Sequence, residues 1–275
     1  PDMIATYLAD CGIDVFLAAN NHIYDKGGSG AQRTIEKYRE LHSTHGVMFL
    51  GIAEDSEEIA HNCPLMIGIK GMRLALLNFT YATNGGRRNG WPKVCYMDDR
   101  DAIRDGISTA HRKDADMIIA MPHWGNEYEL HHSQDQEDTA EWLIEEGVDA
   151  VIGTHPHVVQ DTETIYRNGK AIPIAYSLGN AVSNMSARNT QIELMITLKA
   201  ARDTDGILKI LEPEYTFLWC SRPGGFNDSY TVIPIREFID KEDLWNDIWD
   251  YKKMISSYER VKTATGIKDI TDTHD

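Results

Sequence analysis

Hydrophobic and polar positions along the first part of the chain predict helices and strands in alternation. Stretches with apolar residues at helical spacing alternate with short apolar runs, which are typical of buried strands. We expect helices over residues 3–11, 30–42, 98–113 and 134–146, and strands over residues 15–19, 47–51, 64–69, 72–79, 116–125 and 149–157. The two runs 64–69 and 72–79 are joined at Lys70 and Gly71 and read as a hairpin. Alternating strands and helices predict an α/β fold built in layers.

The pattern changes after residue 157, where short apolar runs follow one another. We expect strands over residues 162–166, 172–178, 191–198, 207–218 and 230–234. These runs predict a second, mostly antiparallel sheet. A closing helix is expected over residues 242–261, with Trp245 and Trp249 on one face as core packing. The sequence therefore predicts one domain over residues 1–265, an α/β layered sandwich of two mixed sheets flanked by helices, and a polar tail over residues 266–275.

Residues 81–97 form a polar stretch rich in Gly and Asn between two predicted elements. A loop of this length within a compact domain is often a lid or a binding loop. Arg87 and Arg88 in this loop could meet an anionic substrate, or they could form a solvated basic pair.

The net charge of the chain argues against some classes of binding partner. The 275 residues include 43 acidic and 27 basic side chains, for a formal net charge of -16. This charge argues against a nucleic-acid partner and against adhesion to anionic lipid. No apolar stretch is long enough to span a membrane. The four cysteines form no CxxC pair, so they indicate neither a zinc knuckle nor a redox dithiol.

The chain shows no signal peptide at its start and opens in what reads as a helix already under way. We expect the natural N-terminus, with any targeting segment, to lie upstream.

Three of the expected buried strands end in histidine. One run leads to Asn21 and His22, a second to His123, and a third to His155 and His157. In open α/β sheets, ligands bind outside the carboxyl ends of the strands. Imidazole is a common ligand of divalent metals, and an Asn oxygen can join it. A single histidine at a strand end is more often structural, but four at three equivalent positions favour a shared metal or catalytic site. We expect all five side chains within one cleft, on the order of 10 Å across for two metals.

Four segments resemble a known family: "ANNHIYDKG" (19–27), "PHWGNEYE" (122–129), "GTHPHVVQ" (153–160) and "YSLGN" (176–180). Together, in this order, they resemble the CapA-like proteins of bacterial capsule and poly-gamma-glutamate synthesis, which are related to calcineurin-like metallophosphoesterases. The resemblance implies a metallophosphoesterase-like fold.

The resemblance also implies roles for the histidines. A Gly-Asn-His-Asp motif in metallophosphoesterases supplies a metal-binding Asn and a histidine that acts at the leaving group, which match Asn21 and His22. His123 matches a metal-binding histidine after a later strand. His155 and His157 match the two metal ligands of a Gly-His-x-His motif, here with one inserted residue.

Two divalent metals are implied, of the kind Mn, Fe or Zn. The acidic ligands that such proteins carry on their first two strands, in a Gly-Asp and an Asn-Leu-Glu segment, are absent from this chain.

Other candidates surround these ligands. Asp25 could orient His22 as a second catalytic group, or could be a turn residue. Trp124, Glu127 and Tyr128 are candidates for substrate binding beside His123, although Trp124 could simply pack. Asn180 is a further candidate for substrate binding.

The expected function is that of a metal-dependent hydrolase or transferase acting on a capsule or cell-envelope polymer or a phosphoester. The alternative is a non-catalytic, polymer-binding component of a capsule synthesis or export assembly. An anionic polymer or a phosphoester is the expected partner, and the cell envelope is the suspected location.

Overall fold

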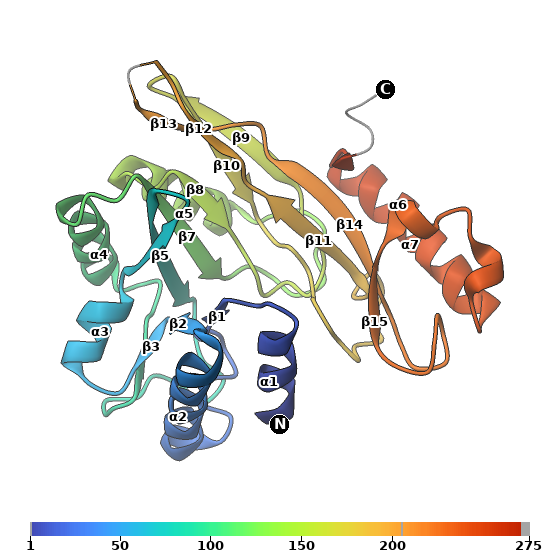
Figure 1. Ribbon diagram of the computed structural model, residues 1–275, viewed down its shortest axis with the longest axis horizontal. Coiled ribbons are helices and arrows are strands. Elements are labelled where there is room, and N and C mark those ends of the chain that lie inside the picture. Colours follow the sequence, from blue (N-terminus) through green and yellow to red (C-terminus); the bar gives the residue numbers. More distant parts are fainter. Residues whose placement is uncertain (1, 205, 271–275) are drawn as a thin grey trace. The chain divides into compact units, whose positions relative to one another are not determined.

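The computed structural model describes residues 2–204 and 206–270, which fold into two compact units. The first unit contains the chain up to His123 together with Glu145–Val148, and the second contains Trp124–Ile144 and the chain from Asp149 on. Figure 1 shows that each unit combines helices with strands.

The first unit is built around three paired strands. β4 (Leu65–Ile69) and β5 (Met72–Thr80) form the antiparallel hairpin predicted from the sequence, and β5 runs parallel to β7 (Met117–His123). The register pairs Thr80 with His123, so the carboxyl ends of β5 and β7 coincide. Polar groups that follow these strands therefore share one edge.

Shorter strands and the helices α1 to α4 make up the rest of the first unit as far as its residues are described. β1 (Val15–Leu17) runs parallel to β2 (Met48–Leu50), and β3 (Ile52–Ala53) pairs with β6 (Lys93–Val94). The helices are α1 (Asp2–Asp10), α2 (Gly27–His45), α3 (Ser56–Asn62) and α4 (Arg100–Arg112). α2 packs its apolar side, including the fully buried Ile35, against Phe49 and Ile52. Burial of this apolar face stabilises α2, and α2 directly follows the segment 18–26 that comes after β1.

The longer strands of the second unit lie in two groups within its described residues. In one, β10 (Lys170–Ala175) runs parallel to β8 (Ala150–Ile152) and antiparallel to β9 (Thr162–Arg167). In the other, β14 (Glu214–Ser221) lies between β11 (Ile192–Thr197) and β15 (Thr231–Pro234), with antiparallel pairing on both sides.

The second unit also contains α5 (Gln134–Glu146), except for the last two residues of this helix, which belong to the first unit. β12 (Ala200–Arg202) pairs with β13 (Leu208–Ile210). The short α6 (Ile235–Phe238), a 3-10 turn (Glu242–Leu244) and α7 (Ile248–Thr265) follow. α7 covers β11 and β14, where Phe217 and Trp219 are buried against Met254 and Tyr258.

The predicted α/β class is confirmed, with mixed sheets flanked by helices. The predicted strand 207–218 is split into β13 and β14, because residues 211–213, which include Pro213, interrupt the pairing. The single domain over residues 1–265 stays a prediction. Part of the expected tail, residues 271–275 with His274, lies outside the described residues.

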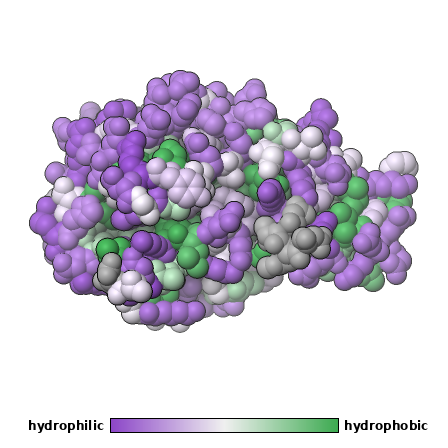
Figure 2. All heavy atoms as spheres, turned by 90° about the horizontal axis from the view of Figure 1, so that it is seen from above, coloured by the Kyte–Doolittle hydropathy of each residue, from purple (hydrophilic) through white to green (hydrophobic). Residues whose placement is uncertain are grey.

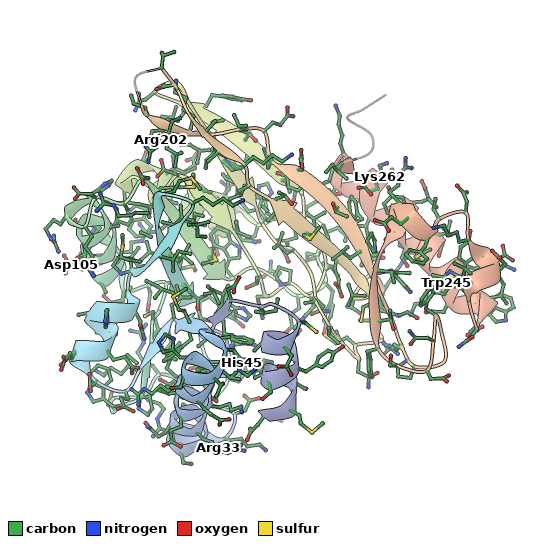
Figure 3. All side chains as sticks on the ribbon, viewed as in Figure 1. Arg33, His45, Asp105, Arg202, Trp245 and Lys262 are labelled. Atoms are coloured by element: carbon green, nitrogen blue, oxygen red, sulfur yellow. The ribbon has the colours of Figure 1, made fainter. Side chains whose placement is uncertain are left out.

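The expectation for the closing helix was wrong in one respect. α7 begins at Ile248, where the Asp247 side chain accepts a hydrogen bond from the Trp249 backbone N–H over 2.9 Å. Trp245, labelled in Figure 3, therefore precedes the helix. Its side chain is buried, whereas that of Trp249 is 72% exposed. The two indoles do not share a packed face.

Within residues 2–204 and 206–270, no helix combines the length and the apolar character needed to cross a membrane. The face drawn in Figure 2 is largely hydrophilic, with apolar side chains in small patches.

Candidate metal centre

Asn21 and His123 meet at the strand ends of the first unit. Asn21 lies four residues beyond the end of β1 and is buried, and His123 is the last residue of β7. Their Oδ1 and Nε2 atoms are 3.0 Å apart. Two ligands of one ion, each about 2.1 Å from it, lie at a similar separation. The pair predicted from the sequence to bind metal is thus brought together.

His22 and Asp25 form a second contact in the same segment. The imidazole Nδ1 lies 2.8 Å from Oδ2 of Asp25, and both side chains are about half exposed. The orienting role considered for Asp25 agrees with this hydrogen bond. When Nδ1 donates to the carboxylate, Nε2 is left to accept or deliver a proton.

Asn84, which the sequence did not single out, holds this segment from the loop 81–97. Its Nδ2 lies 3.3 Å from Nδ1 of His22, and its Oδ1 accepts from Nδ2 of Asn21 over 3.4 Å. Its backbone N–H also donates to the carbonyl of Asn21 over 2.8 Å. The Gly- and Asn-rich composition of the loop was the available signal.

Asn78 on β5 fixes the turn that precedes Asn21. Its Oδ1 accepts from the backbone N–H of Ala19 over 2.8 Å, and its Nδ2 donates to the carbonyl of Met121 over 2.7 Å. Gly51 allows this approach, because a Cβ there would lie 2.2 Å from Oδ1 of Asn78, and its φ of +90° also favours glycine.

The second unit brings Glu127, His155 and His157 together. Each offers one ligand atom, and these atoms lie within 4.8 Å of one another. Nε2 of His157 is 4.0 Å from Oε1 of Glu127. A carboxylate and two imidazoles are a donor set that suits a divalent transition metal. Glu127 was predicted to bind substrate, which stays a prediction, and its position also makes it a candidate metal ligand.

Asn180 sets the orientation of His157. Its Nδ2 donates to the carbonyls of His157 and Thr190 over 3.2 and 3.0 Å, which identifies its Oδ1 as the atom 2.8 Å from Nδ1 of His157. Nδ1 therefore carries the proton, and the lone pair on Nε2 faces Glu127. In the structure Asn180 orients the imidazole of His157, and the substrate-binding role predicted for Asn180 stays a prediction.

The backbone at the two histidines lies in a region that side chains seldom adopt. φ is +108° at His155 and +61° at His157, and Tyr128 has a φ of +69°. Such conformations are concentrated at functional sites, since the surrounding structure must hold them. Here the backbone N–H of Tyr128 donates to the carbonyl of Pro156 over 2.8 Å.

Trp124 is buried within the second unit. It is 1% exposed, its Nε1 donates to the carbonyl of Tyr176 over 2.9 Å, and its backbone N–H donates to the carbonyl of Thr154. This burial agrees with the packing alternative weighed from the sequence, and the substrate-binding role of Trp124 stays a prediction. Tyr128 is 45% exposed with its ring 6.1 Å from that of His157, and its substrate-binding role stays a prediction.

Comparison with known proteins identifies the family. The family described as "Bacterial capsule synthesis protein PGA_cap" matches residues 1–185, more than half of the chain. The chain belongs to this family. The resemblance inferred from its four motifs is thereby confirmed.

Two curated relatives within this family are CapA proteins. The capsule biosynthesis protein CapA of Bacillus anthracis is 28% identical over 207 residues, which cover 74% of this chain and 48% of the relative. The PGA biosynthesis protein CapA of Bacillus subtilis (strain 168) is 27% identical over 205 residues, covering 74% of this chain and 51% of the relative. The chain thus spans about half the length of the curated relatives it matches.

Solved structures give more distant likenesses. A 5'-nucleotidase precursor from Thermus thermophilus has a TM-score of 0.48 at 11% identity, covering 94% of this chain and 46% of that one. The calcineurin-like phosphoesterase YfkN from Bacillus subtilis has a TM-score of 0.44 at 14% identity, covering 96% and 73%. Nothing about the chemistry of the present chain follows from likenesses at this level.

Each unit of this PGA_cap family chain therefore holds one part of the predicted constellation. Asn21 contacts His123 in the first unit, and His155 lies with His157 and Glu127 in the second. That both parts share one cleft stays a prediction.

Proposed function

We propose that this chain carries the metal-binding residues of a metal-dependent hydrolase or transferase that acts on a capsule or cell-envelope polymer or a phosphoester. The observation that supports the proposal most is the group Glu127, His155 and His157, whose ligand atoms lie within 4.8 Å of one another. The family's description as a capsule synthesis protein gives the polymer context.

The donor set fits a bound divalent metal. His155 is buried, His157 has its Nδ1 satisfied by Asn180, and Glu127 supplies a negative charge that offsets part of the ion's charge. Imidazole nitrogens favour Mn, Fe or Zn over Mg or Ca, whose ligands are oxygens. We include a second ion at Asn21 and His123 in the proposal, since their ligand atoms are 3.0 Å apart.

When bound, such metals polarise an electrophile and lower the pKa of a coordinated water. The chain's own residues supply the other functions. Glu127, His155 and His157 would hold the metal, and Asn180 fixes the ring of His157. His22 donates a hydrogen bond from Nδ1 to Asp25, and in its doubly protonated form the imidazole would deliver the Nε2 proton to a leaving group as a general acid.

Metal content and turnover test the proposal together. The purified chain is supplied with Mn²⁺, Fe²⁺ or Zn²⁺, its metal content is measured by mass spectrometry, and hydrolysis of bis-p-nitrophenyl phosphate is followed. We expect His157→Ala to lose metal and turnover, and His61→Ala, which removes an exposed imidazole on α3, to keep both. Equal metal content in the His157→Ala and unsubstituted chains would contradict the proposal.

The same measurements distinguish the alternative, a non-catalytic polymer-binding component of a synthesis or export assembly. That alternative predicts binding of an acidic polymer with no turnover of phosphodiester or polymer under any of the three metals.

We also propose a cell-envelope location, which rests on the family's role in capsule synthesis. Fractionation of cells that express the natural protein tests it, and recovery in the cytosolic fraction alone would contradict it.

A further inference from the structure

Two cysteines of the first unit that stand far apart in the sequence meet in the fold. Cys63 caps the C-terminal end of α3, and Cys95 directly follows β6. Their thiol groups form a hydrogen bond with each other. The spacing of the cysteines did not indicate a redox dithiol, because the chain has no CxxC pair. The dithiol is made by the packing of α3 beside the loop that contains Cys95.

Hydrogen bonds hold the backbone of both cysteines. The N–H of Cys63 donates to the carbonyl of Ile59 over 3.0 Å. The N–H of Cys95 donates to the carbonyl of Gly51 over 2.9 Å, and its carbonyl accepts from the N–H of Thr80 over 3.0 Å. Two thiols held in this way react with each other far more readily than two thiols on freely moving segments.

A cavity gives small molecules access to the two sulfur atoms. The side chains of Cys63 and Cys95 are both half-buried, and both line a cavity of about 890 Å³ among α3, α4 and the loop 81–97. Its size is at the upper end of the roughly 300–1,000 Å³ typical of ligand pockets. A disulfide-bearing molecule of a few hundred daltons therefore has room to approach the pair.

The hydrogen bond between the thiols makes them chemically unequal. It lowers the pKa of Cys63, and together with burial it holds the pKa of Cys95 well above its usual range. Cys63 is thus the acceptor that loses its proton first, and Cys95 is the donor. Because the thiolate is the form of cysteine that attacks a disulfide, Cys63 is the better placed of the two to react first.

We propose that Cys63 and Cys95 form a redox-active dithiol, in which Cys63 attacks a low-molecular-weight disulfide and Cys95 then closes an intrachain disulfide with Cys63. The inference goes beyond the proposed function, because the proposed metal ligands take no part in it. It assigns a site of reversible covalent modification to the first unit.

The reaction is a two-step thiol–disulfide exchange. The Cys63 thiolate forms a bond to one sulfur of the small disulfide, whose S–S bond breaks and releases one small thiol. The Cys95 thiolate then attacks the sulfur of Cys63 and releases the second small thiol. The two protein thiols lose two electrons and two protons, and the small disulfide gains both as two thiols. Excess dithiothreitol runs the same steps in reverse.

The disulfide would close a covalent ring over residues 63–95. This ring contains β4, β5, β6 and most of the loop 81–97, so it fastens the far end of that loop to the end of α3. Closing a long ring restricts the unfolded chain more than the folded chain. The oxidised chain should therefore unfold at a higher urea concentration than the reduced chain.

Peptide mass spectrometry of the unsubstituted chain tests the proposal directly. The reduced chain is treated with oxidised glutathione, and the remaining thiols are blocked with N-ethylmaleimide. Trypsin cleaves after Lys70, between the two cysteines, so their disulfide appears as a pair of linked peptides. We expect this pair in a chain with the mass of one copy, and we expect dithiothreitol to remove it. The exposed Cys11 should carry glutathione, and the buried Cys220 should stay a thiol.

Two results of this experiment would overturn the proposal. One is glutathione on both Cys63 and Cys95 with no linked pair, which would mean that the two sulfur atoms cannot join. The other is a free thiol at both positions after glutathione has modified Cys11, which would mean that the cavity does not admit the disulfide.

Single substitutions test which sulfur attacks. In Cys95→Ser the serine hydroxyl can still donate to Cys63, so Cys63 should take up one glutathione and stop there. In Cys63→Ser the remaining Cys95 should react more slowly, by about 3-fold or more, because less of it is thiolate. Cys11→Ser is the matched control and should form the linked pair at the unsubstituted rate. Faster uptake at Cys95 than at Cys63 would overturn the assigned order.

Unfolding and metal content separate this inference from the proposed function. Oxidised glutathione should raise the urea midpoint of the unsubstituted chain and leave that of Cys63→Ser unchanged, and equal shifts in the two would contradict a ring over residues 63–95. Cys63→Ser should keep the metal content of the unsubstituted chain, and His157→Ala should form the linked pair at the unsubstituted rate. Absence of the linked pair from every variant would overturn the dithiol and leave the metal centre standing.

Discussion

His157 and Asn180 are joined by two hydrogen bonds, one between Nδ1 and Oδ1 at 2.8 Å and one from the Asn180 amide to the His157 carbonyl at 3.2 Å. Ring and backbone of the same residue are thus fixed by one side chain. This arrangement turns Nε2 toward Glu127 before any metal arrives.

Asn180→Ala should therefore weaken metal binding although Asn180 is not a ligand. Loss of a group that orients a ligand commonly lowers affinity by about 10- to 100-fold. Titration calorimetry with Zn²⁺ or Mn²⁺ measures it. Asn246→Ala, at an exposed position in the same unit, should behave like the unsubstituted chain.

Glu127→Gln removes the negative charge from the group that also contains His155 and His157. We expect metal affinity to fall, because a neutral amide offsets less of the ion's charge than a carboxylate. Glu129→Gln makes the same chemical change two residues away, outside the group. Similar metal affinities in the two variants would mean that Glu127 is not a ligand.

His157→Ala and His22→Ala should have different effects on metal content and turnover. The first should lower metal content, because an imidazole ligand is lost. The second should keep the metal but slow turnover by about 100-fold or more, since it removes a proton donor held by Asp25. Metal analysis and initial rates on the same samples decide this, and the reverse pattern would show that the roles are misassigned.

Glu193 gives a pH-dependent prediction for stability. Burial raises the pKa of this carboxyl to about 9, with a hydrogen bond from Cys220 acting in the opposite direction. The folded chain binds the Glu193 proton more tightly than the unfolded chain does. The contribution of this bound proton to the free energy of unfolding is therefore complete below about pH 4.5 and is lost as the pH rises through about 9.

Glu193→Gln, which is always neutral, should therefore be more stable than the unsubstituted chain at pH 8, by on the order of 3 kcal/mol. The difference should shrink toward pH 5. Urea unfolding at both values measures it, and Glu212→Gln at an exposed position serves as control. A difference that does not change with pH would contradict a raised pKa.

Gly153 lies where the surrounding atoms leave no room for a Cβ. A Cβ at this position would lie 2.1 Å from the Tyr176 carbonyl oxygen and 2.3 Å from Nε1 of Trp124. Gly153→Ala should lower the free energy of unfolding by about 3 kcal/mol or more. Gly68→Ala, where a Cβ would meet nothing within 4 Å, should change it little. Thermal unfolding of both variants is the measurement.

The strand-end histidines were predictable because their signal is local. Apolar runs that end in His22, His123, His155 and His157 predicted strand ends, and β7 and β8 end at or just before such residues. The contact between Asn21 and His123 was expected from the rule that carboxyl ends of parallel strands share an edge, but β1 and β7 belong to different sheets, so the rule alone does not account for it.

Contacts made across the fold were not predictable in this way. Asn78 and Asn84 reach Ala19 and Asn21 from positions about 60 residues away in sequence, and the Gly- and Asn-rich composition around Asn84 does not tell which residues it contacts. Trp249 was misjudged because helical spacing alone does not tell where a helix begins, which here depends on the Asp247 cap.

Asn84 belongs to the loop 81–97, and this position has a further consequence. Asn84, which touches His22, stands three residues before Arg87, and Thr83 bonds to the carbonyl of Gly86 and to the hydroxyl of Tyr96. A ligand that immobilises Arg87 and Arg88 would also restrict the positions open to the His22 imidazole. Asn84 therefore connects the position of the loop 81–97 to the orientation of the His22 imidazole.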